Sequence, residues 1–481
     1  MPTMDRRTLI QSAGGLALGL AASDATVAAT SPPRRFAIVG QGSRSQMYLS
    51  AITGKYRSGN ELVALCDNNR GRLQLAARSA VDAGVRAPKQ YLAADFDRLL
   101  RETKPHAVIV TTPDATHDDY IVRSLDAGCD VITEKPMTTT PEKAQRILDA
   151  CKRNDRHVRV LFNYRYSPPR TQVKELLMSN EIGDILSVDF NWLLNTQHGA
   201  DYFRRWHSQK AISGGLMIHK ATHHFDLVNW WLGAQPDTVL AYGKREYYTP
   251  AMARRMGLKS HHERCHTCPE KTDCTFFLDL AADPKLRALY LENEQHDGYF
   301  RDQCVFRPEI DIEDTMNVIV RYDTGATLSY SLNACNAWEG YQIAFNGTKG
   351  RLEHQIVEQV YVAGGNMTQG GIADNGVRTR VIPLRGAIRD IEPWTGTGGH
   401  GGGDDLMLSE LFGTAAPDKY QRASDERGGA ASILIGAAAN QCFQTGQAVR
   451  IAELVSGLVP PNAAPMPNRA TPVPMPRSVR L

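Results

Sequence analysis

One short stretch near the start of the chain constrains its fold more than any other feature. An apolar run at residues 36–39 ends in Gly40-Gln41-Gly42, and a helical pattern follows over residues 46–55. Residues 61–66 then read as a second buried strand, which ends at Asp67. A strand, a glycine turn, a helix and a strand with a terminal acid form the layout of a dinucleotide-binding unit. The sequence therefore predicts a Rossmann domain.

The glycine turn and the terminal acid also predict how a dinucleotide binds. Gly40 and Gly42 permit a tight turn and close approach of the backbone to a pyrophosphate at the helix N-terminus. Asp67 would accept hydrogen bonds from a ribose 2′-hydroxyl and repel a 2′-phosphate, which favours NAD. Arg70 lies close enough in sequence to keep NADP open as an alternative.

Three further strand-and-turn units follow, at residues 107–117, 130–136 and 158–168. Each carries a polar cluster directly after its apolar run. Strands that alternate with helices indicate a parallel sheet, and ligands of such sheets bind at the carboxyl ends of the strands. We therefore expect these polar clusters to meet at one site.

These motifs together resemble those of the Gfo/Idh/MocA oxidoreductases, the family of glucose-fructose oxidoreductase and inositol dehydrogenase. The resemblance covers about residues 35–235 and 315–453. It rests on these motifs, in family order: Gly40-Gln41-Gly42, Thr112-Pro113 with His117, Glu134-Lys135-Pro136, Asn163-Tyr164-Arg165-Tyr166, Gly183, Gly214-Gly215, His223, Asp226-Leu227, Trp231-Leu232-Gly233 and Gln444-Thr445-Gly446-Gln447-Ala448-Val449.

The resemblance implies a two-domain α/β fold. Residues 33–157 would form the Rossmann domain with a parallel sheet, and residues 158–455 an α/β domain with a large, open, mostly antiparallel sheet that covers the nicotinamide. Residues 185–190 and the two strands around Asp323-Thr324-Gly325, a hairpin signal, agree with the second sheet. Residues 456–481, rich in proline, are interpreted as an extended or disordered tail.

The resemblance further implies roles for single residues. Lys135 would contact the nicotinamide ribose and the substrate hydroxyl, where its charge stabilises a developing alkoxide. His223 would be the general acid or base, because imidazole titrates near neutral pH. The expected cofactor-binding residues are Gly40, Gly42, Ser43, Arg44, Asp67, Thr112, Pro113, His117, Glu134, Lys135 and Asn163, and the expected substrate-binding residues are Arg165, Tyr166, His219, His223 and His400.

One position departs from the family pattern, since His219 stands where relatives usually carry Asp. Residues 214–226 are helical by pattern, so His219 and His223 would share a face. They would form either an acid/base pair without a carboxylate or part of a divalent metal site with a third ligand from elsewhere.

His400 lies in a glycine-rich loop at residues 398–403. Such a loop could carry the imidazole over a sugar site, a pattern that resembles one in subgroups with NAD-dependent glycosidases. The same loop is equally typical of a plain helix entry with Asp404 near the N-cap.

An insert at about residues 243–313 separates the matched segments and carries four cysteines. The spacing of Cys265, Cys268, Cys274 and Cys304 suits a structural zinc or an iron–sulfur cluster. In an exported protein the same residues would pair as disulfides, and functionless free thiols are the third interpretation. Because the insert is remote in sequence from the chemistry, we expect a structural role for it.

Residues 1–32 are interpreted as an export signal. Arg6-Arg7 precede a weakly apolar run at residues 14–22 and a small-residue stretch at residues 26–29, which resembles a twin-arginine signal. A short amphipathic helix is the alternative. The signal implies the twin-arginine export machinery as a partner and a periplasmic or otherwise exported protein.

Charge and hydropathy exclude several other classes of partner. The net charge of +3 is spread over 481 residues, which argues against nucleic acid. No stretch of eighteen apolar residues occurs, so no permanent membrane span is expected. By resemblance alone, the chain is expected to form a homo-oligomer.

The expected function is that of an exported oxidoreductase with tightly bound NAD(H) or NADP(H). It would move hydride to or from a secondary hydroxyl of a sugar, a sugar derivative or a cyclitol. The alternative is an NAD-dependent glycosidase that works by transient oxidation and elimination. Lys135 in an intact Glu134-Lys135-Pro136 favours the first. Lys135 and His223 together disfavour a redox-inactive sugar-binding protein.

Overall fold

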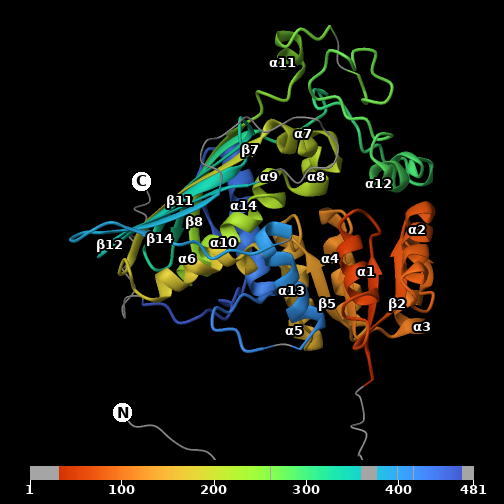
Figure 1. Ribbon diagram of the computed structural model, residues 1–481, viewed down its shortest axis with the longest axis horizontal. Coiled ribbons are helices and arrows are strands. Elements are labelled where there is room, and N and C mark those ends of the chain that lie inside the picture. The colour runs from red at the N-terminus through yellow and green to blue at the C-terminus, as the bar shows by residue number, and fades with distance from the viewer. Residues whose placement is uncertain (1–31, 260–261, 359–375, 398, 415, 468–481) are drawn as a thin grey trace, which may run out of the picture. The chain divides into compact units, whose positions relative to one another are not determined.

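The structure is a computed structural model that describes residues 32–259, 262–358, 376–397, 399–414 and 416–467 (Figure 1). The export signal expected at residues 1–32 lies outside the described residues except for its last residue, and so does the end of the proline-rich tail. Among the described residues, none of the helices combines the length and the apolar character that crossing a membrane requires.

A parallel sheet with helices on both faces forms the first layer. Its strands lie in the order β15-β6-β5-β4-β1-β2-β3. They are β1 (Arg34–Val39), β2 (Asn60–Asp67), β3 (Lys89–Leu92), β4 (Ala107–Val110), β5 (Asp130–Glu134), β6 (Val158–Leu161) and the short, antiparallel β15 (Ser424–Asp425). Every residue of β4 is buried, as expected for a central strand between two helix layers. The predicted Rossmann sheet is confirmed.

The helices of this layer follow their strands along the chain. They are α1 (Ser45–Thr53), α2 (Arg70–Asp82), α3 (Phe96–Thr103), α4 (His117–Asp126) and α5 (Pro141–Asn154). One more helix, α13 (Gly403–Phe412), reaches this sheet from the far end of the chain. The ring of its Phe412 packs edge-on against Phe36 of β1, and its carbonyl accepts a hydrogen bond from Asn60 of β2.

A second, mostly antiparallel sheet follows, in the order β14-β13-β12-β11-β7-β10-β9-β8-β16. Its strands are β7 (Ile185–Asn195), β8 (Pro236–Lys244), β9 (Thr315–Tyr322), β10 (Thr327–Asn336), β11 (Gly340–Gly347), β12 (Gly350–Val357), β13 (Val377–Pro383), β14 (Arg389–Ile391) and β16 (Val449–Arg450). Only the β7–β10 pair is parallel among the paired strands described. This open sheet confirms the expected second domain.

The helices beside this sheet are α6 (Pro168–Met178), α7 (Thr196–Arg204), α8 (Lys210–Ser213), α9 (Leu216–His219), α10 (Thr222–Leu232) and α14 (Glu426–Thr445). The single helix expected over residues 214–226 is wrong. The amide of Ala221 bonds back to the carbonyl of Leu216, whereas that of His223 bonds back only to Lys220, so the regular ladder is broken between α9 and α10. His219 and His223 therefore lie on different helices.

The insert extends from the second domain and carries α11 (Pro250–Arg255) and α12 (Pro284–Leu286) (Figure 1). It has a small core of its own, built from Cys265, Leu278, Leu280 and Leu286. A buried ion pair between Arg264 and Asp302 joins two of its segments. In Figure 1 its α12 end lies beside α2 of the Rossmann layer.

Candidate functional site

A cavity of about 780 Å³ opens where the carboxyl ends of the first sheet face the second domain and the insert. Volumes of roughly 300–1,000 Å³ are usual for ligand sites. Fourteen of the expected site residues line this cavity: Gly40, Gly42, Ser43, Arg44, Asp67, Thr112, Pro113, His117, Glu134, Lys135, Asn163, His219, His223 and His400. The polar clusters that the sequence places at separate strand ends therefore meet at one site.

The glycine turn forms an open cradle at the N-terminus of α1. A Cβ on Gly40 would lie 2.7 Å from the backbone of Thr111, so only glycine fits between β1 and β4. A Cβ on Gly42 would instead point into the cavity, where its nearest neighbour is the Tyr290 hydroxyl at 3.7 Å. The backbone amide of Ser43 donates to that same hydroxyl at 3.2 Å. The turn thus offers free space and a backbone donor where a pyrophosphate would lie.

Asp67 is held at the end of β2 with its carboxylate at the cavity. Its oxygens accept hydrogen bonds from the amides of Gln41 and Asn69. The guanidinium of Arg72 lies 3.6 Å away. Burial raises the pKa of Asp67, and Arg72 and the two amides oppose that shift. A carboxyl group fixed in this way presents its oxygens to the hydroxyls of a ribose.

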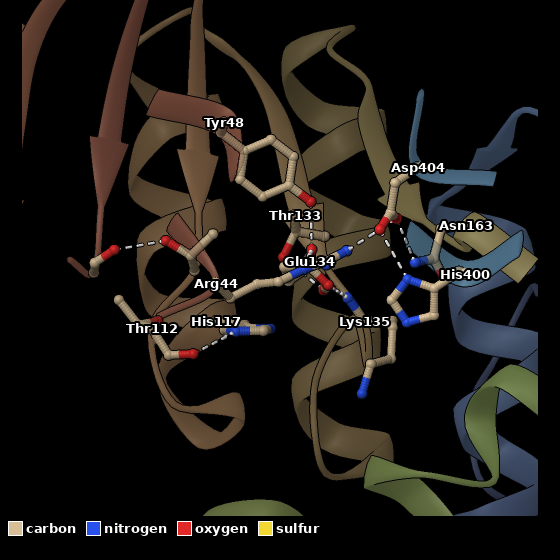
Figure 2. A network of polar contacts seen from close by, with 12 residues as sticks. Arg44, Tyr48, Thr112, His117, Thr133, Glu134, Lys135, Asn163, His400 and Asp404 are labelled. Carbon is tan, nitrogen blue, oxygen red and sulfur yellow. Dashed lines mark hydrogen bonds and ion pairs between the residues drawn. The ribbon is translucent and has the colours of Figure 1, made fainter. Parts of the chain in front are cut away.

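Glu134, at the end of β5, is the centre of a network of polar contacts (Figure 2). Its carboxylate accepts hydrogen bonds from Tyr48 and Arg44 and, at 3.2 Å, from the amide of Lys135. His117 spans the neighbouring loops, with one ring nitrogen 2.9 Å from the carbonyl of Thr112 and the other 2.9 Å from that of Pro136. These contacts fix the backbone on both sides of the Lys135 side chain.

Lys135 points toward α9. Its Nζ donates to the His219 carbonyl at 3.0 Å and lies 3.4 Å from Nε2 of the same histidine. Burial lowers the pKa of Lys135 to about 8, and the nearby Asp114 carboxylate opposes the shift. The Lys135 side chain therefore remains mostly charged at neutral pH and titrates just above it.

His219 is paired with a carboxylate that arrives from another strand end. Its Nδ1 lies 2.5 Å from the carboxylate of Asp114, which follows β4. Burial lowers the pKa of His219 well below its usual value and raises that of Asp114. The expected acid/base pair of His219 and His223 without a carboxylate is therefore wrong, because Asp114 supplies one to His219. The alternative of a divalent metal on the two imidazoles is also not supported, since no such ligand group occurs among the described residues.

His223 stacks on the ring of Tyr164, with the ring centres 4.2 Å apart. Its Nδ1 is buried and has no hydrogen-bond partner among the described residues. Burial, helped by Lys135 and Lys220, lowers the pKa of His223 well below its usual value. The imidazole is therefore in its neutral form at pH 7.

The glycine loop brings His400 to the same cavity. Its Nδ1 lies 2.8 Å from the carboxylate of Asp404, which also accepts a hydrogen bond from Asn163 at 2.7 Å (Figure 2). The ring centre lies 5.6 Å from that of Tyr164. Gly402 is the N-cap of α13, so Asp404 lies in the first turn and fixes His400 instead of capping the helix.

Two expected substrate residues lie away from the cavity. Arg165 is buried in a two-point ion pair with Asp226, at 2.6 and 2.7 Å. The hydroxyl of Tyr166 donates to Glu410 of α13 at 2.8 Å. Arg165 joins the turn after β6 to α10, and Tyr166 joins it to α13. Neither side chain lines the cavity, so their assignment to substrate is not supported. Their neighbour Tyr164, in the same motif, lines the cavity instead.

Several cavity residues were missed by reasoning from the sequence. They are Asp114, Tyr164, His198, Tyr202, Arg205, Trp206, His207, Lys220, Tyr290, Asp297, Tyr299, Glu339 and Glu358. Asp114 and Tyr164 are adjacent to residues of recognised motifs, so the motifs themselves carried that signal. Glu339 and Glu358 have no local pattern around them, and Tyr290 belongs to the insert.

The four insert cysteines do not form a metal centre. All are free thiols, and the described residues contain no group of three or more His, Cys, Asp or Glu side chains placed to hold a metal. Neither the zinc nor the disulfide interpretation is supported. Cys265 is buried, with its sulfur 3.7 Å from the guanidinium of Arg204.

Residues 34–162 match the oxidoreductase family with an NAD-binding Rossmann fold, and residues 174–451 match the C-terminal alpha/beta domain of the same family. The chain belongs to the Gfo/Idh/MocA oxidoreductases. The resemblance stated from the motifs is thereby confirmed, and the chain is an oxidoreductase with an NAD-binding domain.

Individual Gfo/Idh/MocA relatives differ in how much of the chain they cover. YteT of Bacillus subtilis, named as an oxidoreductase, is 37% identical over 82% of this chain and 93% of its own length. An inositol 2-dehydrogenase of Salmonella paratyphi B is 30% identical over 44% of this chain and 57% of its own length. The crystal structure of an aldose-aldose oxidoreductase from Caulobacter crescentus has the same fold, with a TM-score of 0.57 and 17% identity over 87% of this chain and 99% of that one.

Proposed function

We propose that this Gfo/Idh/MocA protein is an exported, NAD-dependent enzyme that oxidises or reduces a secondary hydroxyl of a sugar, sugar derivative or cyclitol. The observation that carries the proposal is that Lys135 and His223 line the same cavity as the glycine turn and Asp67. A dinucleotide site and an acid/base pair of side chains thus share one space.

The lining fits a nicotinamide dinucleotide. Gly42 leaves room for a pyrophosphate, the amide of Ser43 points into that space, where it donates to the Tyr290 hydroxyl, and Asp67 offers acceptors to a ribose. Lys135 and Asn163 follow β5 and β6, on the side of the cavity toward the second domain. When bound, the nicotinamide supplies hydride acceptance or donation.

Lys135 and His223 have different roles in the reaction at the substrate hydroxyl. The ammonium of Lys135 stabilises negative charge on the substrate oxygen, because a cation in a site shielded from water acts more strongly than in bulk solvent. The neutral imidazole of His223 takes up or returns the hydroxyl proton. His219 and Asp114 position Lys135 from the other side.

The substrate half of the cavity suits a small polyhydroxylated molecule. Tyr202, Arg205, Lys220, Glu339 and Glu358 surround it with donors and acceptors. Such a lining favours a ligand with several hydroxyl groups, since a ligand with fewer hydroxyl groups would leave buried polar groups of the protein unpaired, which is costly. The names of the inositol and aldose relatives agree with this substrate class.

Export would require the enzyme to keep its cofactor, because the periplasm has no free nicotinamide pool. Twin-arginine signals serve proteins that fold before transport. The insert supports retention, since its Tyr290, Asp297 and Tyr299 line the cavity on the side of the glycine turn and Asp67.

We include a homo-oligomer in the proposal, supported by the apolar Tyr242 and Ile319, which are 64% and 55% exposed on neighbouring strands of the open sheet. Light scattering of the purified protein tests it.

Cofactor occupancy tests the proposal first. The protein purified from a cytoplasmic fraction should release a nicotinamide dinucleotide when it is denatured. Gly42→Val should fold yet lose the dinucleotide, because the branched side chain projects into the cavity and meets little protein. A fully occupied Gly42→Val protein would place the pyrophosphate elsewhere.

A substrate panel tests the reaction. Sugars and cyclitols should change the absorbance of the bound nicotinamide, and a second carbonyl substrate should restore it. Release of the aglycone from glycosides without net cofactor change would instead show a glycosidase. Lys135→Ala and His223→Ala should keep the cofactor but lower turnover about 100- to 10,000-fold. Lys152→Ala, at an exposed site on α5, is the matched control.

A further inference from the structure

We propose that Asp297, carried by the insert, makes the enzyme select NAD over NADP. This inference rests on the proposed use of a nicotinamide cofactor. It concerns the region around Asp67, where a ribose 2′-hydroxyl or 2′-phosphate would lie. In the sequence, Asp67 favours NAD, and Arg70 keeps NADP open.

The insert is built onto the N-terminus of α2. Asn69 donates its side-chain amide to the carbonyl of Asn293 at 2.8 Å. A Cβ on Gly71 would lie 1.6 Å from the side-chain oxygen of Asn293, so the glycine makes room for the insert. These contacts fix the segment that follows, which contains Asp297.

Asp297 is ion-paired with Arg72 of α2. The same guanidinium nitrogen lies 3.6 Å from Asp67. All three side chains are buried, with less than a tenth of their surface exposed, and all three line the cavity. Arg72 therefore lies between one carboxylate from the Rossmann strand and one from the insert.

The other guanidinium nitrogen of Arg72, Nη1, is buried and has no partner among the described residues. A buried donor without a partner is costly, so a ligand oxygen is expected to complete it. Two carboxylates around one guanidinium leave an excess of negative charge. This excess negative charge tolerates the neutral 2′-hydroxyl of a ribose and repels a doubly charged 2′-phosphate.

Without Asp297, Arg72 would face Asp67 alone. The local charge would then balance, and the guanidinium would be free to bind a phosphate in a two-point contact. Arg70, the other candidate, is exposed at the start of α2 and does not line the cavity. The geometry thus makes Arg72 and Asp297, and not Arg70, decide between the two cofactors.

The test compares the dinucleotides that full-length variants carry when purified from the same cytoplasm. Chromatography of the denatured supernatant gives the ratio of NADP(H) to NAD(H). Asp297→Asn should raise that ratio about tenfold or more, because it removes one charge next to the phosphate position. Adding Arg72→Ala to Asp297→Asn should abolish the gain. Glu292→Gln removes a carboxylate that pairs with Arg287 elsewhere on the insert and should leave the ratio unchanged.

An unchanged ratio in a folded Asp297→Asn protein would overturn the inference. Loss of all dinucleotide from a variant with wild-type melting would overturn it too, because Asp297 would then retain the cofactor without selecting it. Should the variant fail to fold, the wild-type protein still decides, since equal loading of NAD and NADP contradicts selection. A wild-type protein that carries and binds no dinucleotide would instead overturn the proposed function itself.

Discussion

At the scale of single residues, His219 changes how the catalytic set is assembled. Relatives are expected to carry a carboxylate at that position, and here the carboxylate comes from Asp114 after β4. The imidazole lies between it and Lys135, 3.4 Å from the ammonium. The negative charge therefore lies farther from the Lys135 ammonium, because the His219 imidazole stands between the two groups.

His219→Asp should lower turnover by about 100-fold or more, although it restores the residue usual in the family. The new carboxylate would face Asp114 across a buried gap, where two like charges cannot both ionise. Asp114→Asn combined with His219→Asp should recover part of the rate. Steady-state kinetics with the preferred sugar measure both. A His219→Asp enzyme with wild-type turnover would show that Asp114 does not act through His219.

The pKa of Lys135 predicts a limb in the pH profile. The pKa is lowered to about 8, so the ammonium is present below that pH and is lost above it. Because the cation stabilises the alkoxide, kcat/KM for alcohol oxidation should fall as the pH rises through about 8. No acid limb from His223 is expected near neutral pH, since its pKa is depressed further. Lys135→Ala should lack the limb, and an unchanged limb in that variant would contradict the assignment.

At the scale of elements, the sequence predicts what a local pattern determines, and it does not predict what depends on packing between distant residues. The strands β1 and β2 were predicted to within two residues, and β4 and β5 begin where their strand-and-turn units were predicted to begin, because each is a buried apolar run that ends in its own turn. The break between α9 and α10 was missed, since it depends on hydrogen bonds that no periodicity reveals. The seating of the insert on α2 was missed as well, because it depends on Gly71 and Asn293, which are far apart in sequence.

Gly71→Ala should loosen the insert without unfolding the Rossmann layer. The added methyl would lie 1.6 Å from Asn293, and overpacking of this kind costs about 1–3 kcal/mol. We expect the cofactor to dissociate faster, and the fluorescence of the released NADH measures the dissociation rate. Gly59→Ala is the control, because a Cβ there meets no atom within 4 Å. Equal dissociation rates in the two variants would show that the insert does not cover the cofactor.

At the scale of the whole molecule, the site depends on both domains. The motifs identified the residues at the carboxyl ends of the first sheet, since that edge follows from the topology alone. They could not identify Glu339 or Glu358, which the second domain brings to the cavity from positions without local pattern. Arg165 and Tyr166 were assigned to substrate, although their side chains are engaged with Asp226 and Glu410 away from the cavity.

Export of the whole protein is predicted to depend on the paired arginines at the start of the sequence. Replacing Arg6 and Arg7 with Lys should leave folding and cofactor content unchanged while the protein stays in the cytoplasm, because the twin-arginine machinery reads that pair. Cell fractionation with the wild-type chain as control measures the distribution. Equal periplasmic amounts of the two proteins would contradict a twin-arginine signal.

The short strand β15 has a consequence for the order in which the protein is made. Ser424 and Asp425 pair with β6, and α13 packs on β1 and β2, so the Rossmann sheet is completed by residues near the end of the chain. A ribosome releases those residues last. If the proposed export signal is correct, the nascent chain would thus expose it long before the cofactor site is closed. A translocase that accepts only folded cargo would therefore transport the full-length chain and not a truncated one, because a truncated chain lacks the residues that complete the Rossmann sheet.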